Sequence, residues 1–209
     1  MAVERPTTVI FDLGGVLIDW NPRYLYRRLF DDEPAMERFL AEVCTPDWNL
    51  SLDAGRSFAE AVAELGARHP QERERIAAYQ ERWLEMIAGP IAPTVAVLEE
   101  LTAAGVPLWA LTNWSAETFQ LVRDEPAYRF LDRFRAIFVS GELRLVKPEP
   151  AIFRHVLAEI GARAQECLFI DDAPKNVDAA EAIGMCGHRF TDAVGLRSEL
   201  VALGFLDGA

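Results

Sequence analysis

The sequence is poor in the residue types that most often bind transition metals or form disulfides. It has only three histidines and three cysteines among 209 residues. Cys44, Cys167 and Cys186 are far apart, odd in number and in no Cys-x-x-Cys spacing, and the histidines are equally scattered. We therefore expect reduced thiols rather than a disulfide framework or a zinc site, which indicates a cytoplasmic protein.

The chain also lacks long hydrophobic runs and an excess of positive charge. No apolar stretch approaches the length of a membrane span, and the segment before Val9 is too short and polar for a signal peptide. The net charge is −12, which argues against nucleic acid or an anionic membrane as a partner. A small anionic substrate stays compatible with this charge, because local positive groups can dominate inside a cleft.

Lysine is nearly absent, although cationic residues are not. Of 21 lysines and arginines, only Lys147 and Lys175 are lysines. Arginine cannot replace lysine where a compact ammonium group is needed, so these two positions stand out. Chance retention explains either of them equally well, and we expect Lys175 to be a solvated residue in the first turn of a helix.

From about residue 93 onward the sequence repeats a helical segment, a glycine and an apolar run. The pairs are "TVAVLEELTAAG" before "VPLWALTN", "PAIFRHVLAEIG" before "ARAQECLFIDD", and "NVDAAEAIG" before "MCGHRF". The apolar runs are short and do not alternate, as expected for strands buried on both faces of a parallel sheet. With one more strand at about 8–12, the pattern predicts an α/β fold with a doubly wound parallel sheet.

Residues from about 16 to 90 interrupt this pattern. They contain consecutive helical segments, "PRYLYRRLF", "PAMERFLAEV", "SFAEAVAELGARH" and "ERERIAAYQERWLEMI", with no convincing strand between them. We therefore expect residues 1–15 and 91–209 to form the core and residues 16–90 to form an inserted α-helical cap. An insertion after the first strand lies over the carboxyl edge of the sheet, where such folds bind ligands, so it is placed to act as a lid.

Polar residues follow the predicted strands. They are Asp12 after the first strand, Thr112 and Asn113 after the second, Lys147 in "RLVKPEP" after the run "AIFV", and Asp171 and Asp172 after "CLFI". Because the carboxyl ends of parallel strands share one edge, we expect these six residues to converge. Each aspartate or lysine taken alone has a structural explanation, such as a helix cap or an exposed turn. Four such segments in this order are much harder to explain by chance.

The convergence suggests phosphoryl-transfer chemistry. Three carboxylates resist ionisation together unless positive charge neutralises them, and Mg²⁺ takes oxygen ligands while keeping waters or phosphate oxygens. Asp12 can then serve as ligand and nucleophile, because aspartate forms acyl-phosphate intermediates. Lys147 would keep Asp12 ionised and offset charge on the transferred group. The Thr112 hydroxyl and the amides around Asn113 would bind phosphoryl oxygens.

Four segments resemble the motifs of the haloacid dehalogenase superfamily, in the subgroup with a C1-type helical cap after the first strand. They are "FDLGGVL" around Asp12, "LTN" at Thr112, "KPEPAIF" at Lys147, and "FIDDAPKNVDAAEAIG" at Asp171 and Asp172. They occur in order over nearly the whole chain. The resemblance implies a Rossmann-like core with Asp12 as the nucleophile.

The resemblance also implies a metal site. Its ligands would be the Asp12 carboxylate, the Gly14 carbonyl oxygen and one or both of Asp171 and Asp172. By spacing, Asp172 matches the usual metal-binding aspartate better. Asn176 then occupies the position of a second acidic residue, which gives this amide at most a supporting role.

One position departs from the pattern. Phosphatases of this superfamily usually carry a second aspartate two residues after the nucleophile, which protonates the leaving group and then activates water. Here that residue is Gly14, and loss of a general acid typically costs about 10²–10⁴ in rate. A phosphatase with Gly14 needs a good leaving group or another proton carrier, for which Asp19, water and the substrate are candidates.

Three functions fit these residues. The first is a Mg²⁺-dependent phosphatase that hydrolyses a small phosphomonoester through an aspartyl-phosphate on Asp12; some sugar-phosphate phosphatases share the Asp-Leu-Gly start. The second is a metal-independent 2-haloacid dehalogenase with an ester intermediate on Asp12, since halide leaves without a proton. The pair Asp171–Asp172 opposes that function, because it would repel an anionic substrate. The third is a non-catalytic phosphate-binding relative, which the joint presence of Asp12, Thr112 and Lys147 opposes.

The insertion contains residues that could face a substrate pocket. We single out Trp20, Asn21, Trp48 and Arg56 there, and Trp114 in the core. Packing inside the helical layer explains the aromatic residues equally well.

Overall fold

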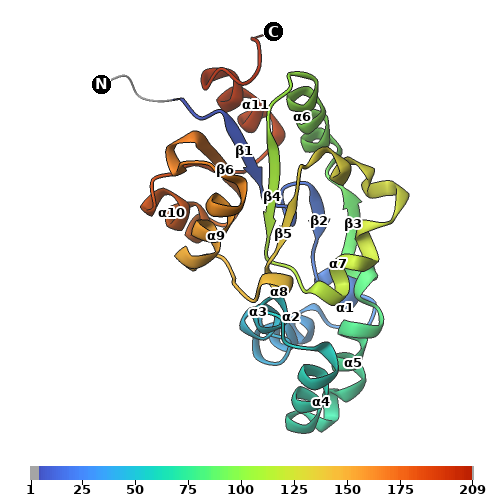
Figure 1. Ribbon diagram of the computed structural model, residues 1–209. Helices are drawn as coiled ribbons and strands as arrows, with labels where there is room; N and C mark the ends of the chain where they lie inside the picture. The colour runs from blue at the N-terminus through green and yellow to red at the C-terminus, as the bar shows by residue number, and fades with distance from the viewer. Residues whose placement is uncertain (1–4, 209) are drawn as a thin grey trace.

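A five-stranded parallel sheet forms the centre of the protein, whose computed structural model describes residues 5–208 (Figure 1). The strands are β1 (Thr8–Phe11), β4 (Leu108–Thr112), β5 (Ile137–Val139), β6 (Cys167–Asp171) and β7 (Cys186–Arg189). Their order is β5-β4-β1-β6-β7, and every pairing is parallel. This confirms the predicted Rossmann-like sheet, with β1 at its centre.

Helices cover both faces of the sheet, and the side chains of β1 point alternately to each. Val9 and Phe11 pack in a core cluster that includes residues of α6 (Ala92–Ala103) and α11 (Ala193–Ala202). Ile10 packs in a second cluster with residues of α9 (Pro150–Ile160) and α10 (Pro174–Ala182). Burial on both faces explains why the strand is an unbroken apolar run. In Figure 1, α9 and α10 lie together on one side of the sheet and α6 lies on the other.

A helical layer lies beyond the carboxyl edge of the sheet, in the lower part of Figure 1. It consists of α1 (Arg23–Tyr26), α2 (Glu33–Glu42), α3 (Pro46–Asp53), α4 (Phe58–Arg68), η1 (Pro70–Glu72), α5 (Arg73–Glu81) and η2 (Trp83–Met86). The predicted helical segments are present, and α3 is an additional helix. A capping pattern starts it, because Thr45 Oγ1 accepts a hydrogen bond from the Trp48 N–H at 3.1 Å and Pro46 occupies the first turn.

Among the described residues, no strand separates the helical segments, but two strands that were not predicted lie at the ends of residues 16–90. Strands β2 (Ile18–Trp20) and β3 (Ile87–Pro90) form an antiparallel ribbon in which Ile18 pairs with Pro90. Both strands are short, and β3 contains glycine and proline, which are unfavourable in strands. The ribbon forms where the chain leaves the core and returns to it. The division into a core and a cap at residues 16 and 90 stays a prediction.

The remaining elements connect the sheet to its surroundings. They are α7 (Ala116–Arg123), η3 (Pro126–Arg133), α8 (Ser140–Leu143) and η4 (Ala164–Glu166). Helix α9 ends at Gly161 in the left-handed conformation, with a φ of +67°, as its sequence predicts. Among residues 5–208, no helix combines the length and hydrophobicity that crossing a membrane requires.

Candidate active site

Lys147 joins two carboxylates beneath the carboxyl edge of the sheet. Its Nζ lies 3.0 Å from Asp12 Oδ2 and 2.7 Å from Asp171 Oδ2, and it donates to the Leu111 carbonyl oxygen at 3.0 Å. The side chain is only 1% exposed. An ammonium group has three N–H donors, and three converging acceptors match them in a way that a planar guanidinium group does not. The structure thus places one of the two lysines at the predicted edge of the sheet.

Asp171 is fully engaged by protein donors. Besides Lys147, its carboxylate accepts from the Ala173 N–H at 2.9 Å and from Asn176 Nδ2 at 3.0 and 3.1 Å. The residue has no exposed surface. Asp171 therefore fixes the position of Lys147, and Asn176 supports Asp171.

Asp172, unlike the buried Asp171, is exposed and lies against the loop after β1. Gly15 there has a φ of +74°, and a Cβ atom at Gly15 would lie 2.5 Å from Asp172 Oδ2. Glycine is required at this position both for its conformation and for the close approach of the carboxylate. By contrast, a Cβ at Gly14 would meet no atom within 4 Å.

The three aspartates form a compact set of oxygen donors. One oxygen each from Asp12, Asp171 and Asp172 lies within 4.8 Å of the others. Burial raises the pKa of Asp12, with the charges of Asp171 and Asp172 adding to this effect and Lys147 opposing it. Burial lowers the pKa of Lys147, but Asp12 and Asp171 outweigh burial and the net shift is upward. One ammonium group among three carboxylates leaves a deficit of positive charge that suits a hard divalent cation.

Thr112 and Asn113 complete the predicted group at the end of β4. Thr112 lines a cavity beside Asp12. The Asn113 side chain bridges the backbone of Lys147, with Nδ2 donating to the Lys147 carbonyl at 2.9 Å and Oδ1 accepting from the Lys147 N–H at 2.8 Å. The Asn113 amide therefore positions the lysine, while its residue also borders the cavity.

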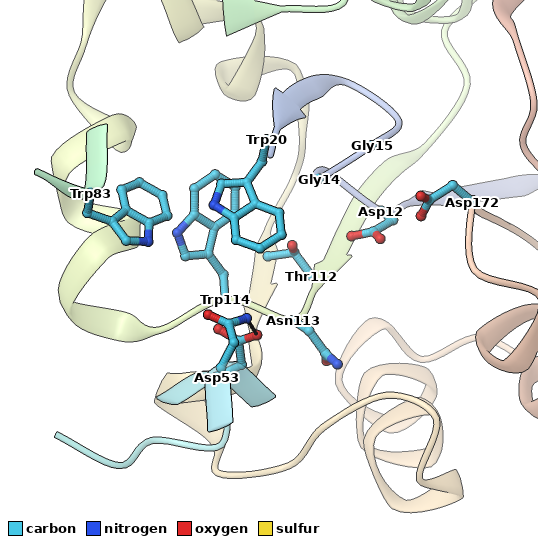
Figure 2. Close-up of a pocket in the computed structure, with 11 residues that line it drawn as sticks. Asp12, Gly14, Gly15, Trp20, Asp53, Trp83, Thr112, Asn113, Trp114 and Asp172 are labelled. Atoms are coloured by element: carbon cyan, nitrogen blue, oxygen red, sulfur yellow. Dashed lines mark hydrogen bonds between the residues drawn. The ribbon is translucent and has the colours of Figure 1, made fainter. Parts of the chain in front are cut away.

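The cavity has a volume of about 310 Å³ and opens between the sheet edge and the helical layer. It is lined by Asp12, Gly14, Gly15, Trp20, Asn49, Asp53, Trp83, Thr112, Asn113, Trp114 and Asp172. Figure 2 shows Asp12 and Asp172 on one side of the cavity and the three indole rings of Trp20, Trp83 and Trp114 on the other. The rings of Trp83 and Trp114 are 5.4 Å apart between centroids. No arginine, lysine or histidine lines this cavity among the described residues.

The structure separates the residues singled out as pocket-facing. Trp20 and Trp114 line the cavity, whereas Asn21, Trp48 and Arg56 are not among its described lining residues. Trp48 instead packs edge-on against Tyr79 with ring centroids 5.0 Å apart, which is the alternative that its helical setting allowed. Arg56 forms an ion pair with Glu64 within the helical layer.

The candidate proton carrier Asp19 and the second lysine also lie outside this cavity. Both carboxylate oxygens of Asp19 accept from the Tyr24 hydroxyl, at 2.9 and 3.0 Å. Lys175 is exposed in the first turn of α10, as expected, and borders a neighbouring cavity.

Sequence reasoning missed Asp53. This residue ends α3, is 9% exposed and accepts a hydrogen bond from Asn49 Nδ2 at 3.0 Å. Asn49 Oδ1 in turn accepts from the Tyr79 hydroxyl at 2.7 Å. Burial raises the pKa of Asp53 to about 7, against a backbone hydrogen bond from Ser115 and the charge of Lys147. The Thr45-Pro46 capping pair could have revealed the helix, but not the direction in which Asp53 points.

Comparisons with known proteins agree with this geometry. The family model for haloacid dehalogenase-like hydrolases matches residues 6–184. The chain is 31% identical to the sesquiterpene phosphatase of Aspergillus oryzae over 91% of this chain and 93% of that protein. It is 27% identical to the phosphoglycolate phosphatase of Yersinia pseudotuberculosis over 84% of this chain and 77% of that protein.

Solved structures show the same fold. A predicted hydrolase of this family from Porphyromonas gingivalis aligns with a TM-score of 0.72 at 24% identity, covering 95% of this chain and 98% of that chain. A family enzyme from Bacteroides thetaiotaomicron, in complex with magnesium and inorganic phosphate, aligns with a TM-score of 0.68 at 22% identity, covering 89% and 94%. The chain thus belongs to the haloacid dehalogenase-like hydrolases and is a phosphatase-like hydrolase.

Proposed function

We propose that this protein is a Mg²⁺-dependent phosphatase that hydrolyses a small phosphomonoester through an aspartyl-phosphate on Asp12. The main observation in support is the buried Lys147 ammonium group, which forms ion pairs with Asp12 and Asp171. The Asp172 carboxylate lies close to both aspartates and, like Asp12, lines the cavity. Phosphatases among the relatives, and a structural neighbour that binds magnesium and phosphate, support this function.

Each residue then has a defined part. The Asp12 carboxylate attacks phosphorus, and Lys147 holds Asp12 in place and favours its charged form. Thr112 and the backbone amides near Asn113 bind phosphoryl oxygens. Asp12, Thr112 and Asn113 line the cavity, and Lys147 contacts Asp12.

The metal ligands in this proposal are Asp12, the Gly14 carbonyl oxygen and Asp172. Asp171 supports them from behind, since Lys147, Ala173 and Asn176 already occupy its oxygens. Asn176 Oδ1 is buried and has no hydrogen-bond partner among the described residues, which fits a site completed by a hydrated cation. When bound, Mg²⁺ would neutralise charge on the carboxylates and on the transferring phosphoryl group.

The cavity favours a substrate whose alcohol part is apolar or aromatic and carries no second anionic group. Three tryptophans supply large apolar faces, and no described cationic side chain borders the cavity to pair with a carboxylate. Of the chemistries named for the relatives, a sesquiterpene phosphate fits these walls better than phosphoglycolate. Sugar phosphates, which stack on aromatic rings, belong in the same test panel.

A 2-haloacid dehalogenase is the second candidate, because Gly14 cannot donate a proton and a halide needs none. Two dehalogenase structures share the fold, with TM-scores of 0.64 and 0.63 at 18% and 20% identity. The carboxylates of Asp171 and Asp172 argue against it, since they surround Asp12 with negative charge that repels a haloacid anion.

The test is phosphate release from a panel that contains farnesyl phosphate, naphthyl phosphate, glucose 6-phosphate and phosphoglycolate. Wild type is compared with Asp12→Asn and with Asp178→Asn, an exposed aspartate on α10 that serves as the control. We expect Mg²⁺-dependent release that EDTA and Asp12→Asn abolish, with the apolar esters preferred. Halide release from 2-chloropropionate without phosphate release would replace this function by dehalogenation.

A further inference from the structure

The cavity contains carboxyl groups that could replace the proton donor missing at Gly14. Three aspartates line it: Asp12, Asp172 and Asp53. Asp12 is the nucleophile of the proposed function, and Asp172 belongs to the cluster proposed to hold the metal. Asp53 is the one that approaches from the helical layer, which is the side that the alcohol part of a substrate must occupy when its phosphoryl group lies at Asp12.

We propose that Asp53 is the general acid and base of this enzyme, delivered from helix α3 to the leaving-group oxygen. The inference rests on the proposed phosphatase function. In Figure 2, Asp53 lies across the pocket from Asp12, with Thr112 between the two and Trp114 directly beside Asp53. A donor in this position faces the bond between phosphorus and the leaving oxygen from the side opposite the nucleophile.

Hydrogen bonds hold the Asp53 carboxyl group in place. Asn49 Nδ2 donates to Asp53 Oδ2, and the Tyr79 hydroxyl fixes Asn49 in turn. The Ser115 N–H also donates to Asp53. These partners are all donors, so a proton on Asp53 finds its acceptor in the cavity rather than among them. A carboxylic acid with its proton directed into the cavity is the state that a general acid needs.

The electrostatic surroundings keep that proton bound near neutral pH. Desolvation by burial dominates, and Lys147 is the cation that opposes it. Asp12 and Asp172 line the same cavity, and Tyr79 on α5 and Lys175 on α10 line the neighbouring cavity with Asp53. Arg144 at the end of α8 lies against Gly55, two residues after Asp53. The pKa of Tyr79 is raised well above its usual value by its own burial, so Tyr79 stays neutral.

Asp53 loses one proton and regains one proton in each turnover. As the Asp12 carboxylate forms its bond to phosphorus, the bond from phosphorus to the alcohol oxygen breaks, and that oxygen takes the proton of Asp53. Water then attacks phosphorus, the bond to Asp12 breaks, and the proton lost by water returns to Asp53. Asp53 thereby ends as it began, protonated, and the net reaction is hydrolysis of the ester.

The test compares two leaving groups in Asp53→Asn, an isosteric change that removes the acid. The rate compared is that of alcohol release in a single turnover, which precedes the attack of water. For an alkyl phosphate, whose alkoxide requires a proton, we expect this rate to fall by about 10²–10³-fold. For 4-nitrophenyl phosphate, whose phenolate leaves without one, we expect the single-turnover rate of phenolate release to change by no more than about 3-fold, while steady-state turnover falls because water lacks its base. Wild-type turnover of the alkyl ester should decline as pH rises through about 7, and Asp53→Asn should lose that decline. Asp47→Asn, an exposed aspartate at the start of α3, is the matched control.

A second variant separates catalysis from structure. Gly14→Asp restores the carboxylate that related phosphatases carry, and a Cβ there meets no atom within 4 Å. We expect Gly14→Asp to rescue alkyl phosphate turnover in Asp53→Asn by at least about 10-fold. If Asp53→Asn does not fold, Asp53→Ser is tested in the same way.

The outcomes distinguish the two proposals. Equal losses in the single-turnover release of both leaving groups, or no loss for either, with turnover still dependent on Asp12, would overturn the role of Asp53 and leave the phosphatase intact. Absence of phosphate release from wild type on every ester would overturn the phosphatase function itself.

Discussion

At the residue scale, Asp53 is a carboxyl group that the fold holds in an apolar setting. It lies beside Trp114 and accepts from Asn49, and its pKa is raised from 3.8 to about 7 because burial disfavours the charged form. In the unfolded chain the group ionises freely. The folded state therefore binds more protons than the unfolded state between about pH 4 and pH 7. The contribution of Asp53 to the free energy of unfolding is fully present below about pH 4 and is lost as pH rises through about 7.

We therefore expect Asp53→Asn to change the pH dependence of stability. Relative to wild type, the variant should gain about 3 kcal/mol in free energy of unfolding as pH rises from 5 to 8, because about two units of the pKa shift lie in this window. The measurement is urea unfolding at both pH values for wild type, Asp53→Asn and Asp47→Asn. Parallel pH dependence in all three proteins would contradict a raised pKa at Asp53.

The same scale shows which site residues a sequence can reveal. Asp12, Lys147 and Asp172 could be predicted because each follows or adjoins a strand, and parallel strands bring such residues to one edge. Asp53 stands alone on a helix. Its approach to the site depends on how the helical layer sits on the core, and no local pattern encodes that placement.

At the element scale, α8 connects the helical layer to the core. Ser140, fully buried at the start of α8, accepts from the Trp114 N–H at 2.9 Å and donates to the Asp53 carbonyl oxygen at 2.6 Å. A Cβ at the next residue, Gly141, would lie 2.5 Å from the Ala116 backbone nitrogen, so the backbones approach closely here. One hydroxyl thus links α3 to the loop that follows β4.

We expect Ser140→Ala to destabilise the protein by about 1–3 kcal/mol, because the Trp114 N–H and the Asp53 carbonyl both lose a buried partner. Urea unfolding measures the change. Ser198→Ala is the control, since Ser198 is exposed and its hydroxyl bonds only within α11. A loss no greater than that of the control would show that this link carries little stability.

The elements also differ in how far their sequences predict them. Strands β1, β4 and β6 could be assigned because each is an apolar run, as burial on two faces requires. The edge strand β7 is only partly buried, and its place after a helical segment and a glycine indicated it. Strands β2 and β3 have no such run. They pair because the chain leaves the core and returns to it at the same place, where Ile18 lies opposite Pro90. Helix α3 is short, and only its capping residues signal it.

At the scale of the whole molecule, the cavity lies between the sheet edge and the helical layer, and its polar residues come from both. A ligand that binds only the folded protein raises its stability in proportion to the logarithm of ligand concentration over Kd. Binding at this cavity therefore links the two parts of the chain thermodynamically.

We expect Mg²⁺ with orthovanadate, a mimic of the transferred phosphoryl group, to raise the unfolding temperature. At a concentration of 100 times Kd the gain is about 2.7 kcal/mol. EDTA should remove the gain, and Asp172→Asn should reduce it by weakening the metal site, whereas Asp178→Asn should retain it. Thermal unfolding followed by circular dichroism measures each case. An undiminished gain in Asp172→Asn would exclude Asp172 as a ligand.

The pairing of Ile18 with Pro90 has a consequence for how the sequence of such a protein can evolve. Residues 18 and 90 are neighbours in the β2–β3 ribbon, so the segment between them begins and ends at the same place on the core. The core therefore needs only this short connection, whatever the length of the segment. Because the entropy of closing a loop grows only with the logarithm of its length, the segment can lengthen, shorten or be exchanged at small cost to the sheet. Selection can therefore reshape the walls that meet a substrate while leaving Asp12 and Lys147 untouched.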